Sequence, residues 1–329
     1  MQINVKGISE VFRSQNIFMA IYTKLLENEI QEIMGRYELS VTSYDPIEKG
    51  SGNSNYLVST NHGKFVLTVF EIEPIWAVCC SKVLLLLEKH EFPAPRLQKT
   101  ANGEMLTKYQ GKPVLLKPYI TGYEEADIDD EKAKQVGTAL AKLNEIPAPD
   151  YLPKKHFYVE ITYPKFMEQE IDRNYKKWVE QRYRYIMEKL PSQLPVGLVH
   201  GDIFYDNVLF EDGNFKAILD FSEMSRIYKI YELGMAVVGI CTEETNIVIK
   251  KVRAFVEGYQ EIRQLEEIEK DSLQLCIEWG AILTSAWRFW KYNIDMPDAD
   301  KSEKYMQMVS IAKNVSAIPK EEFKMAVFS

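Results

Sequence analysis

The spacing of apolar residues divides the chain into a β-rich first third and a mainly helical remainder. Residues 24–37 repeat apolar positions at helical spacing. The period then changes to that of strands, with runs around 42–46, 56–59 and 65–70. The stretch "GSGNSN" separates the first two runs, and "NHG" makes a tight turn between the last two. This order predicts a helix followed by a small antiparallel sheet.

The same sheet is expected to continue after one inserted helix. Residues 77–92 show a helical pattern, which Pro93 and Pro95 would stop. Residues 104–120 then contain two short strand-like runs around a Gly-Lys-Pro turn. The first third is therefore predicted to be an antiparallel sheet with one helix after its third strand.

The rest of the chain has mostly helical periodicity. An amphipathic helix is expected over 129–146, which begins with an acidic turn, and a longer helix over 166–190. Two strand-like segments follow, at 198–210 and 215–221, and helices dominate from Tyr231 onward. Internal repeats and low-complexity segments are absent from the sequence.

These changes of texture predict an α+β fold of two lobes. Residues 1–18 form an N-terminal extension to which the sequence assigns no role, and residues 19–117 form a small β-rich N-lobe. Residues 118–122 are a hinge, and 123–329 are a larger, mostly helical C-lobe.

Composition narrows the class of partner. The 329 residues carry a formal net charge of −8, which argues against non-specific binding to nucleic acid or to an acidic membrane. The longest apolar run, 233–240, is too short to span a bilayer, and no signal peptide opens the chain. The four cysteines form no C-x-x-C pair, as is typical of a reducing cytoplasm. A cytoplasmic protein with a small-molecule partner is predicted.

The stretch "LVHGDIFYDNVLF" sets an acid, Asp202, and an amide, Asn207, between two apolar strand-like runs. A third group, Asp220, ends the next strand-like segment. Phosphoryl transfer needs charge neutralisation and positioning, and Mg²⁺ prefers hard oxygen ligands of the kind that Asn207 and Asp220 supply. Asp202 would then be free to accept a hydrogen bond from a substrate hydroxyl. Because D-x-x-x-x-N is common by chance, the apolar frame and the acid after the next strand carry this interpretation.

These segments resemble a known family. "VHGDIFYDNVLF" followed by "AILDF" resembles the motif of the aminoglycoside phosphotransferase and choline kinase superfamily, whose fold is protein-kinase-like. Within it the chain is most similar to homoserine kinases of the second type, through "GSGNSNYLVSTNHGKFVLTVFE", "LPVGLVHGDIFYDNVLF" and "FVEGYQEIR". The resemblance covers residues 19 to about 295.

The resemblance implies a set of site residues. Asp202 matches the catalytic aspartate, and Asn207 and Asp220 match the magnesium ligands. ATP would be the phosphate donor. The nucleotide-covering loop would comprise Gly50, Ser51, Gly52, Asn53, Ser54 and Asn55. The hinge that binds adenine through its backbone would comprise Lys117, Pro118, Tyr119 and Ile120. His200 is interpreted as structural, bonding nearby backbone.

Two positions depart from the wider superfamily and a third departs from homoserine kinases. Thr68 occupies the place where many relatives carry a lysine that grips the phosphates of the nucleotide. The helix glutamate that partners this lysine is also hard to find, since Ser81 stands near its place and Glu88 lies a few turns further on. Glu232 stands where homoserine kinases usually have an aspartate, in a region expected to face the acceptor.

The leading hypothesis is an ATP- and Mg²⁺-dependent kinase of L-homoserine, an enzyme of threonine biosynthesis. Arg288 is the candidate for binding the acceptor's carboxylate, because a guanidinium among aromatic residues needs an anion, and Glu223 is the candidate for its ammonium. One alternative keeps the fold and changes the acceptor to another amino alcohol, a sugar or an aminoglycoside. A second alternative is a nucleotide-binding pseudokinase, which the missing strand lysine favours and the intact acids oppose.

Overall fold

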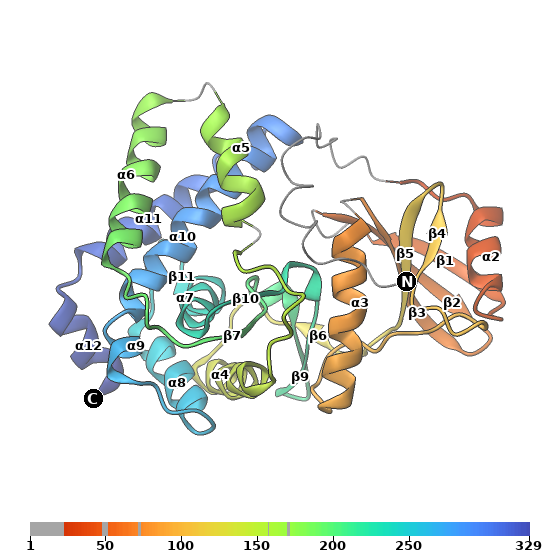
Figure 1. Ribbon diagram of the computed structural model, residues 1–329, viewed down its shortest axis with the longest axis horizontal. Coiled ribbons are helices and arrows are strands. Elements are labelled where there is room, and N and C mark those ends of the chain that lie inside the picture. The colour runs from red at the N-terminus through yellow and green to blue at the C-terminus, as the bar shows by residue number, and fades with distance from the viewer. Residues whose placement is uncertain (1–22, 48–51, 72–73, 157, 170–171) are drawn as a thin grey trace. The chain divides into compact units, whose positions relative to one another are not determined.

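The computed structural model describes residues 23–47, 52–71, 74–156, 158–169 and 172–329 (Figure 1). The N-terminal extension predicted over residues 1–18, together with Gly50 and Ser51 of the predicted nucleotide loop, lies outside the described residues. The described residues form two compact units. The first combines the residues up to Ser81 with Leu97–Tyr119, and the second combines Lys82–Arg96 with Ile120–Ser329.

The first unit contains one antiparallel sheet of five strands, in the order β1-β2-β3-β5-β4. The three strand runs expected from the first change of period are confirmed, and so is the tight turn between the second and third strands. The strands are β1 (Val41–Ile47), β2 (Asn53–Thr60), β3 (Gly63–Phe70), β4 (Thr107–Tyr109) and β5 (Lys112–Pro118).

The turn between β4 and β5 differs from the predicted Gly-Lys-Pro turn. Gln110 and Gly111 have φ angles of 46° and 83°, and Tyr109 pairs directly with Lys112. Two consecutive residues at positive φ match the twist of the strands that they join, so this two-residue loop closes the hairpin and Lys112 already belongs to β5.

Helix α2 (Glu27–Gly35) packs on this sheet and confirms the helix expected over 24–37. Its Ile30, Ile33 and Met34 are buried against Leu67 and Val69 of β3. The three helix residues recur at helical spacing, and the two strand residues alternate along β3. Both periodic patterns of the sequence therefore contribute side chains to one hydrophobic core.

Helix α3 (Pro74–Lys89) contributes residues to both units and ends earlier than its prolines would require. Glu91 has a φ of 53°, and the N–H of Phe92 donates to the carbonyl of Leu87 at 2.9 Å. This left-handed cap ends the helix, so the prediction that Pro93 stops it is wrong.

Helices make up most of the second unit, as predicted. Helix α10 packs against α7 and α11, and α4 packs against α8. The helices of this unit are α4 (Asp130–Glu145), α5 (Tyr163–Glu168), α6 (Arg173–Lys189), α7 (Lys229–Ile240), α8 (Ile249–Gln260), α9 (Glu267–Lys270), α10 (Leu273–Trp290), α11 (Tyr305–Ala317) and α12 (Lys320–Phe328). Two π-helical turns, η2 (Tyr158–Thr162) and η5 (Lys291–Asp295), precede α5 and follow α10.

The single helix expected over 166–190 is wrong, because α5 and α6 are separate. The backbone of Gln169 is extended at the end of α5. The Asp172 side chain then accepts the N–H groups of Asn174 and Tyr175, which caps the start of α6. An N-cap of this kind satisfies donors that have no partner within the helix and so fixes a new beginning.

The short strands of the second unit belong to different sheets. β7 (Val196–Val199) pairs antiparallel with β10 (Ser225–Tyr228), which the sequence analysis missed. β8 (Val208–Glu211) lies between β6 (Tyr123–Glu124) and β9 (Asn214–Ile218). A further hairpin joins β11 (Thr242–Glu243) to β12 (Asn246–Ile247). The segment between β7 and β8 is therefore held by two separate ladders.

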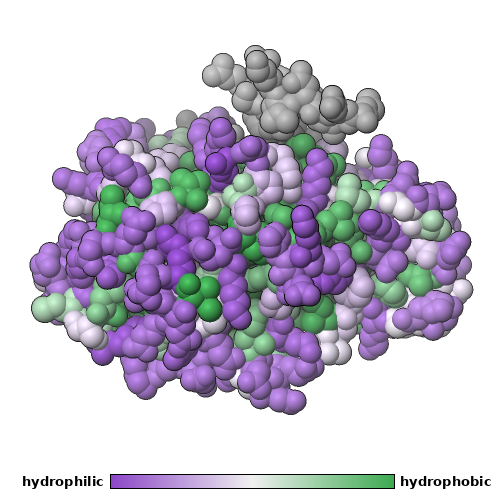
Figure 2. All heavy atoms as spheres, turned by 60° about the horizontal axis from the view of Figure 1, so that its bottom comes forward, coloured by the Kyte–Doolittle hydropathy of each residue, from purple (hydrophilic) through white to green (hydrophobic). Residues whose placement is uncertain are grey.

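The face shown in Figure 2 is mostly hydrophilic, with small groups of hydrophobic residues between the polar ones. Within the described part of the chain, no helix combines the length and the apolar character needed to cross a membrane.

Candidate active site

The loop between β7 and β8 carries Asp202 and Asn207 and is tied down along its length. The turn η3 (Tyr205–Asn207) closes it, with the N–H of Asn207 donating to the carbonyl of Phe204 at 2.9 Å. Helix α7 packs so closely against this loop that a Cβ on Gly239 would lie 2.0 Å from the Ile203 carbonyl oxygen. Only glycine permits this approach, and the loop is thereby a rigid platform.

Asp202 and Asn207 are hydrogen-bonded to each other. The Asn207 side-chain nitrogen donates to the Asp202 backbone carbonyl at 2.8 Å and to Asp202 Oδ2 at 3.0 Å. This assignment of the amide leaves Asn207 Oδ1 as an acceptor with no hydrogen bond to any described residue. Asn207 can thus orient Asp202 with one atom and offer a hard oxygen with the other.

Asp220 lies beside this pair because β9 leads to it. The N–H of Leu219 donates to the Asn207 carbonyl at 2.8 Å, which joins the end of β9 to the loop. Asp220 itself has a φ of 52°, a strained value for a residue other than glycine, and its side chain is exposed apart from a 3.3 Å bond from the Ser222 N–H. Strain of this order is retained where the surrounding structure imposes a particular side-chain direction.

The charges of these acids act on one another. Burial, and then the negative charges of Asp220 and Asp206, raise the pKa of Asp202 to about 7. The hydroxyl of Tyr158 donates to Asp202 Oδ1 at 3.2 Å. This hydrogen bond and the one from Asn207 lower the pKa of Asp202 and so oppose the effect of burial and of the neighbouring charges. A carboxylate with a pKa near neutrality is suited to accepting a proton at physiological pH.

The hydrogen bonds of His200 confirm the prediction that this residue has a structural role. Its Nδ1 accepts the N–H of Asp202 at 3.2 Å, and its Nε2 lies 2.8 Å from the carbonyl oxygen of Leu219. Because Nδ1 accepts, Nε2 carries the proton and donates to Leu219. Burial lowers the pKa of this imidazole, so the neutral ring braces the loop against the end of β9.

Glu232 does not face the acceptor as expected, and that prediction is wrong. Its side chain is fully buried in α7 and accepts the N–H groups of His200 and Gly201, the second at 3.1 Å. Burial raises its pKa to about 8. Without this carboxyl two buried donors would be unsatisfied, at a cost of about 1–3 kcal/mol each. A lone acid within "IYELGMAVVGI" was the signal for such a role.

Tyr158 is a site residue that the sequence analysis missed. Besides bonding Asp202, its ring stacks on Trp287 with centroids 6.0 Å apart and planes 24° apart. Tyr158 is close to Asp202 only through the fold, since 44 positions separate them. The π-helical turn that carries it is a common feature of functional sites.

The two candidate acceptor residues lie in this region. Glu223 Oε2 lies 3.8 Å from His156 Nε2, and burial and the charges of Asp202 and Asp220 raise the pKa of Glu223 well above its usual value. Arg288 donates to Gln307 Oε1 at 2.9 Å and to the Lys304 carbonyl at 3.3 Å.

The Arg288 guanidinium forms no ion pair with a carboxylate of the described residues. Burial lowers its pKa, while Tyr158 and Asp206 act in the opposite direction. A partly buried cation without a carboxylate partner favours binding an anion.

The nucleotide residues predicted in the first unit line its sheet. Thr68 is buried in β3, and its hydroxyl donates to Asn55 Oδ1 at 2.7 Å. Gly52 is open, with no atom within 4 Å of an added Cβ. The Ser54 hydroxyl donates a hydrogen bond to Glu71, which also forms an ion pair with Lys112.

The predicted hinge offers fewer backbone donors than expected. Pro118 has no N–H, and the N–H of Tyr119 donates to the Lys64 carbonyl at 2.9 Å. Lys117 pairs with Val66 two positions along the same ladder, so its N–H also belongs to the sheet, and binding of adenine by residues 117–120 stays a prediction.

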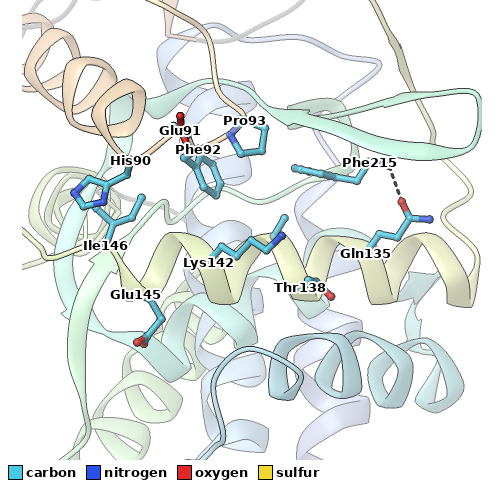
Figure 3. Close-up of a pocket in the computed structure, with 11 residues that line it drawn as sticks. His90, Glu91, Phe92, Pro93, Gln135, Thr138, Lys142, Glu145, Ile146 and Phe215 are labelled. Atoms are coloured by element: carbon cyan, nitrogen blue, oxygen red, sulfur yellow. Dashed lines mark hydrogen bonds between the residues drawn. The ribbon is translucent and has the colours of Figure 1, made fainter.

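A cavity of about 540 Å³ in the second unit is separate from these residues. Figure 3 shows it between the end of α3, one face of α4 and β9. Its wall includes Phe92, Gln135, Lys142 and Phe215, and none of the predicted site residues.

Comparisons with known proteins agree with this geometry. A family model described as a phosphotransferase enzyme family matches residues 43–268. A homoserine kinase of Bartonella tribocorum is 25% identical over 291 residues, covering 85% of this chain and 91% of that protein. A homoserine kinase of Agrobacterium fabrum is 27% identical over 278 residues, covering 80% and 85%. These matches confirm the resemblance inferred from the sequence.

Solved structures confirm the predicted fold class. A microcompartment-associated aminopropanol kinase has a TM-score of 0.70 at 15% identity, covering 87% of this chain and 95% of that one. An amicoumacin kinase, solved with AMP-PNP and Ca²⁺, has a TM-score of 0.68 at 15% identity, covering 91% and 97%. At such identities the likeness establishes the α+β, protein-kinase-like fold alone.

Proposed function

Because the chain belongs to the phosphotransferase enzyme family and acts on a hydroxyl group, we propose that its acceptor is L-homoserine and its donor ATP. The observation that carries this proposal is the similarity to homoserine kinases, at 25% and 27% identity over 85% and 80% of this chain. The product would be a phosphate ester of homoserine, an intermediate of threonine biosynthesis. The lack of a C-x-x-C pair among the four cysteines suits the reducing cytoplasm that we propose as its location.

Asp202 would accept the hydrogen bond of the acceptor hydroxyl and aim its oxygen at the γ-phosphate. Asn207 and Tyr158 hold the two carboxylate oxygens from different directions, at 3.0 and 3.2 Å. A base fixed in this way loses little orientational freedom when the substrate binds. Its pKa of about 7 lets it take up the hydroxyl proton as the phosphate ester forms.

The donor set fits Mg²⁺. Asn207 Oδ1 and the exposed Asp220 carboxylate are hard oxygen atoms joined by the Leu219–Asn207 bond, and phosphate and water would supply the remaining ligands. The described residues contain no cluster of three His, Cys, Asp or Glu side chains that could bind a metal unaided. When bound, the ion would neutralise charge on the phosphates.

ATP would be held without a strand lysine, by backbone N–H groups of the loop 50–55. We expect Thr68→Val to leave the KM for ATP within about threefold, because the Thr68 hydroxyl is occupied by Asn55. Gly52→Leu should instead raise that KM about tenfold or more, since the side chain would fill space the nucleotide needs. Steady-state kinetics at saturating acceptor measures both.

Gly52→Ala is the matched control, because an added Cβ meets no atom within 4 Å and the backbone can keep its conformation. A large effect of Thr68→Val together with none of Gly52→Leu would contradict the assignment of this loop to the phosphates.

Homoserine is a zwitterion at neutral pH, and the site contains a candidate for each charge. Arg288 lacks a carboxylate partner among the described residues, and a guanidinium binds a carboxylate by two parallel hydrogen bonds. Glu223 offers the anion for the ammonium group. A polycationic aminoglycoside would need several acids and no arginine.

We expect Arg288→Met to raise the KM for homoserine about 10- to 100-fold with little change in kcat, because a charge-assisted bond to a group remote from the reaction is lost. Gln307→Leu is the control, since it removes a contact of Arg288 and leaves the guanidinium in place. Release of ADP should be followed with MgATP and homoserine, 3-aminopropanol, choline or kanamycin.

Turnover of homoserine above the other acceptors is the expected result of this panel. Turnover of aminopropanol, choline or kanamycin with none of homoserine would refute the acceptor, and nucleotide binding without any turnover would favour the pseudokinase alternative.

A further inference from the structure

His156 is held in one orientation just before the π-helical turn η2. It is 1% exposed, and its Nδ1 accepts the Tyr158 N–H and the Tyr231 hydroxyl, each at 3.3 Å. The Tyr158 ring meets the imidazole edge-on, with centroids 4.9 Å apart. Because Nδ1 accepts, the proton of the neutral ring lies on Nε2.

The donor that results has no partner. Nε2 of His156 and Oε2 of Glu223 are both buried, and neither forms a hydrogen bond in the described part of the chain. They lie 3.8 Å apart. The Gly201 backbone is close enough to influence the imidazole but does not meet hydrogen-bond geometry. Unsatisfied buried groups are costly, so a facing donor and acceptor left apart indicate a site that is completed by a ligand.

This pair borders the reacting group. Tyr158, whose N–H bonds the imidazole, donates its hydroxyl to Asp202 at 3.2 Å. A Cβ on Gly201, the neighbour of Asp202, would lie 2.2 Å from His156 Nε2. Glu223 has no ion pair with a lysine or arginine among the described residues, and its side chain keeps 18% exposure. One carboxyl oxygen can therefore face His156 while the other faces the acceptor.

We propose that His156 and Glu223 form a subsite for a primary ammonium group of the acceptor, in which His156 is a positioning residue. When the ammonium binds, the Nε2–H of His156, now 3.8 Å from Oε2 of Glu223, would donate to that oxygen while Oε1 faces the ammonium, whose positive charge favours the ionised carboxylate. This inference rests on the proposed function, because it assigns an acceptor with an amine near its hydroxyl. It makes the enzyme selective for amino alcohols over the same alcohols without the amine.

The test compares acceptors that differ only in the amine. Values of kcat/KM are measured for homoserine against 4-hydroxybutyrate, and for 3-aminopropanol against 1-propanol. The wild-type enzyme should favour the amine-bearing member of a pair by about 10- to 100-fold, the effect of one charge-assisted hydrogen bond. Glu223→Gln should abolish the preference through a higher KM for the amine-bearing acceptors.

His156→Leu should reduce the preference similarly, and His156→Gln, which retains a donor at the end of its side chain, should restore part of it. His90→Leu, a change of an exposed histidine, is the control and should leave the preference unchanged. Nucleotide binding and thermal unfolding show whether each variant is folded, and Glu223→Gln remains informative if His156→Leu is not.

The outcomes separate this inference from the proposed function. A preference for aminopropanol that depends on Glu223, with no turnover of homoserine, overturns the acceptor and supports the subsite. Equal turnover of homoserine and 4-hydroxybutyrate overturns the subsite and leaves the acceptor standing. A preference unaltered in folded Glu223→Gln, or no turnover of either amine-bearing compound, also overturns the subsite.

Discussion

Asp220→Ala should lower kcat by at least about 10²-fold while the protein stays folded. The carboxylate is the only charged member of the proposed metal set, and an acidic protein has little other means of offsetting phosphate charge. The side chain is exposed and forms one 3.3 Å bond to backbone, so its removal should cost little stability. Steady-state ADP release at saturating substrates, with circular dichroism and thermal unfolding, measures the two effects.

Asp212→Ala is a closely matched control. Asp212 and Asp220 have φ angles of 50° and 52°, and both side chains are exposed, so both substitutions impose the same backbone cost. Only Asp220→Ala should lose activity and the dependence of activity on Mg²⁺ concentration. Full activity of Asp220→Ala would exclude this residue from the metal site.

Asp202→Asn should lower kcat about 10²- to 10⁴-fold with a much smaller change in the KM for ATP. The carboxylate addresses the acceptor hydroxyl, and general-base contributions are of this order. Because the pKa of Asp202 is raised to about 7, its basic form is lost as the pH falls. In the wild-type enzyme kcat/KM for the acceptor should therefore rise with pH, reach half of its maximum at about pH 7 and level off about one pH unit higher.

Asp206→Asn tests whether the negative charge of Asp206 raises the pKa of Asp202, because Asp206 has no role of its own in the proposed reaction. Asp206 is exposed, and its charge is one of the causes that raise the pKa of Asp202. Its neutralisation should move the acidic limb of the pH profile to lower pH and keep kcat at the plateau within a few fold. A loss of ATP affinity in Asp202→Asn, with kcat preserved, would instead assign Asp202 to the nucleotide or its metal.

Local periodicity was sufficient for most of the first unit. The alternation in β2 and the helical spacing in α2 each specify which side chains are buried, so this part of the sheet and its helix could be predicted before any contact was known. Periodicity did not reveal the break within 166–190, where α5 and α6 share a helical period but Asp172 caps a new start. Capping depends on backbone direction, which periodicity does not report.

The motif could be predicted for a related reason. Asp202 and Asn207 lie five residues apart between two apolar strands, and their mutual hydrogen bonds are local. Asp220 follows the next strand, so its approach needs only the β8–β9 hairpin. Short connections restrict the geometry enough for residue type and spacing to indicate the chemistry.

The groups that complete the site come from distant parts of the chain. Tyr158 reaches Asp202 across 44 positions, and Glu232 bonds the loop across 31 and 32. His156 meets Glu223 only because η2 and η4 (Phe221–Glu223) converge there. Such pairings depend on how helices pack and on which buried polar groups lack partners, and both are properties of the folded whole rather than of any one segment. Residue order was thus enough for the strands, the loop and its acids, whereas packing alone selects the partners that tune and surround Asp202.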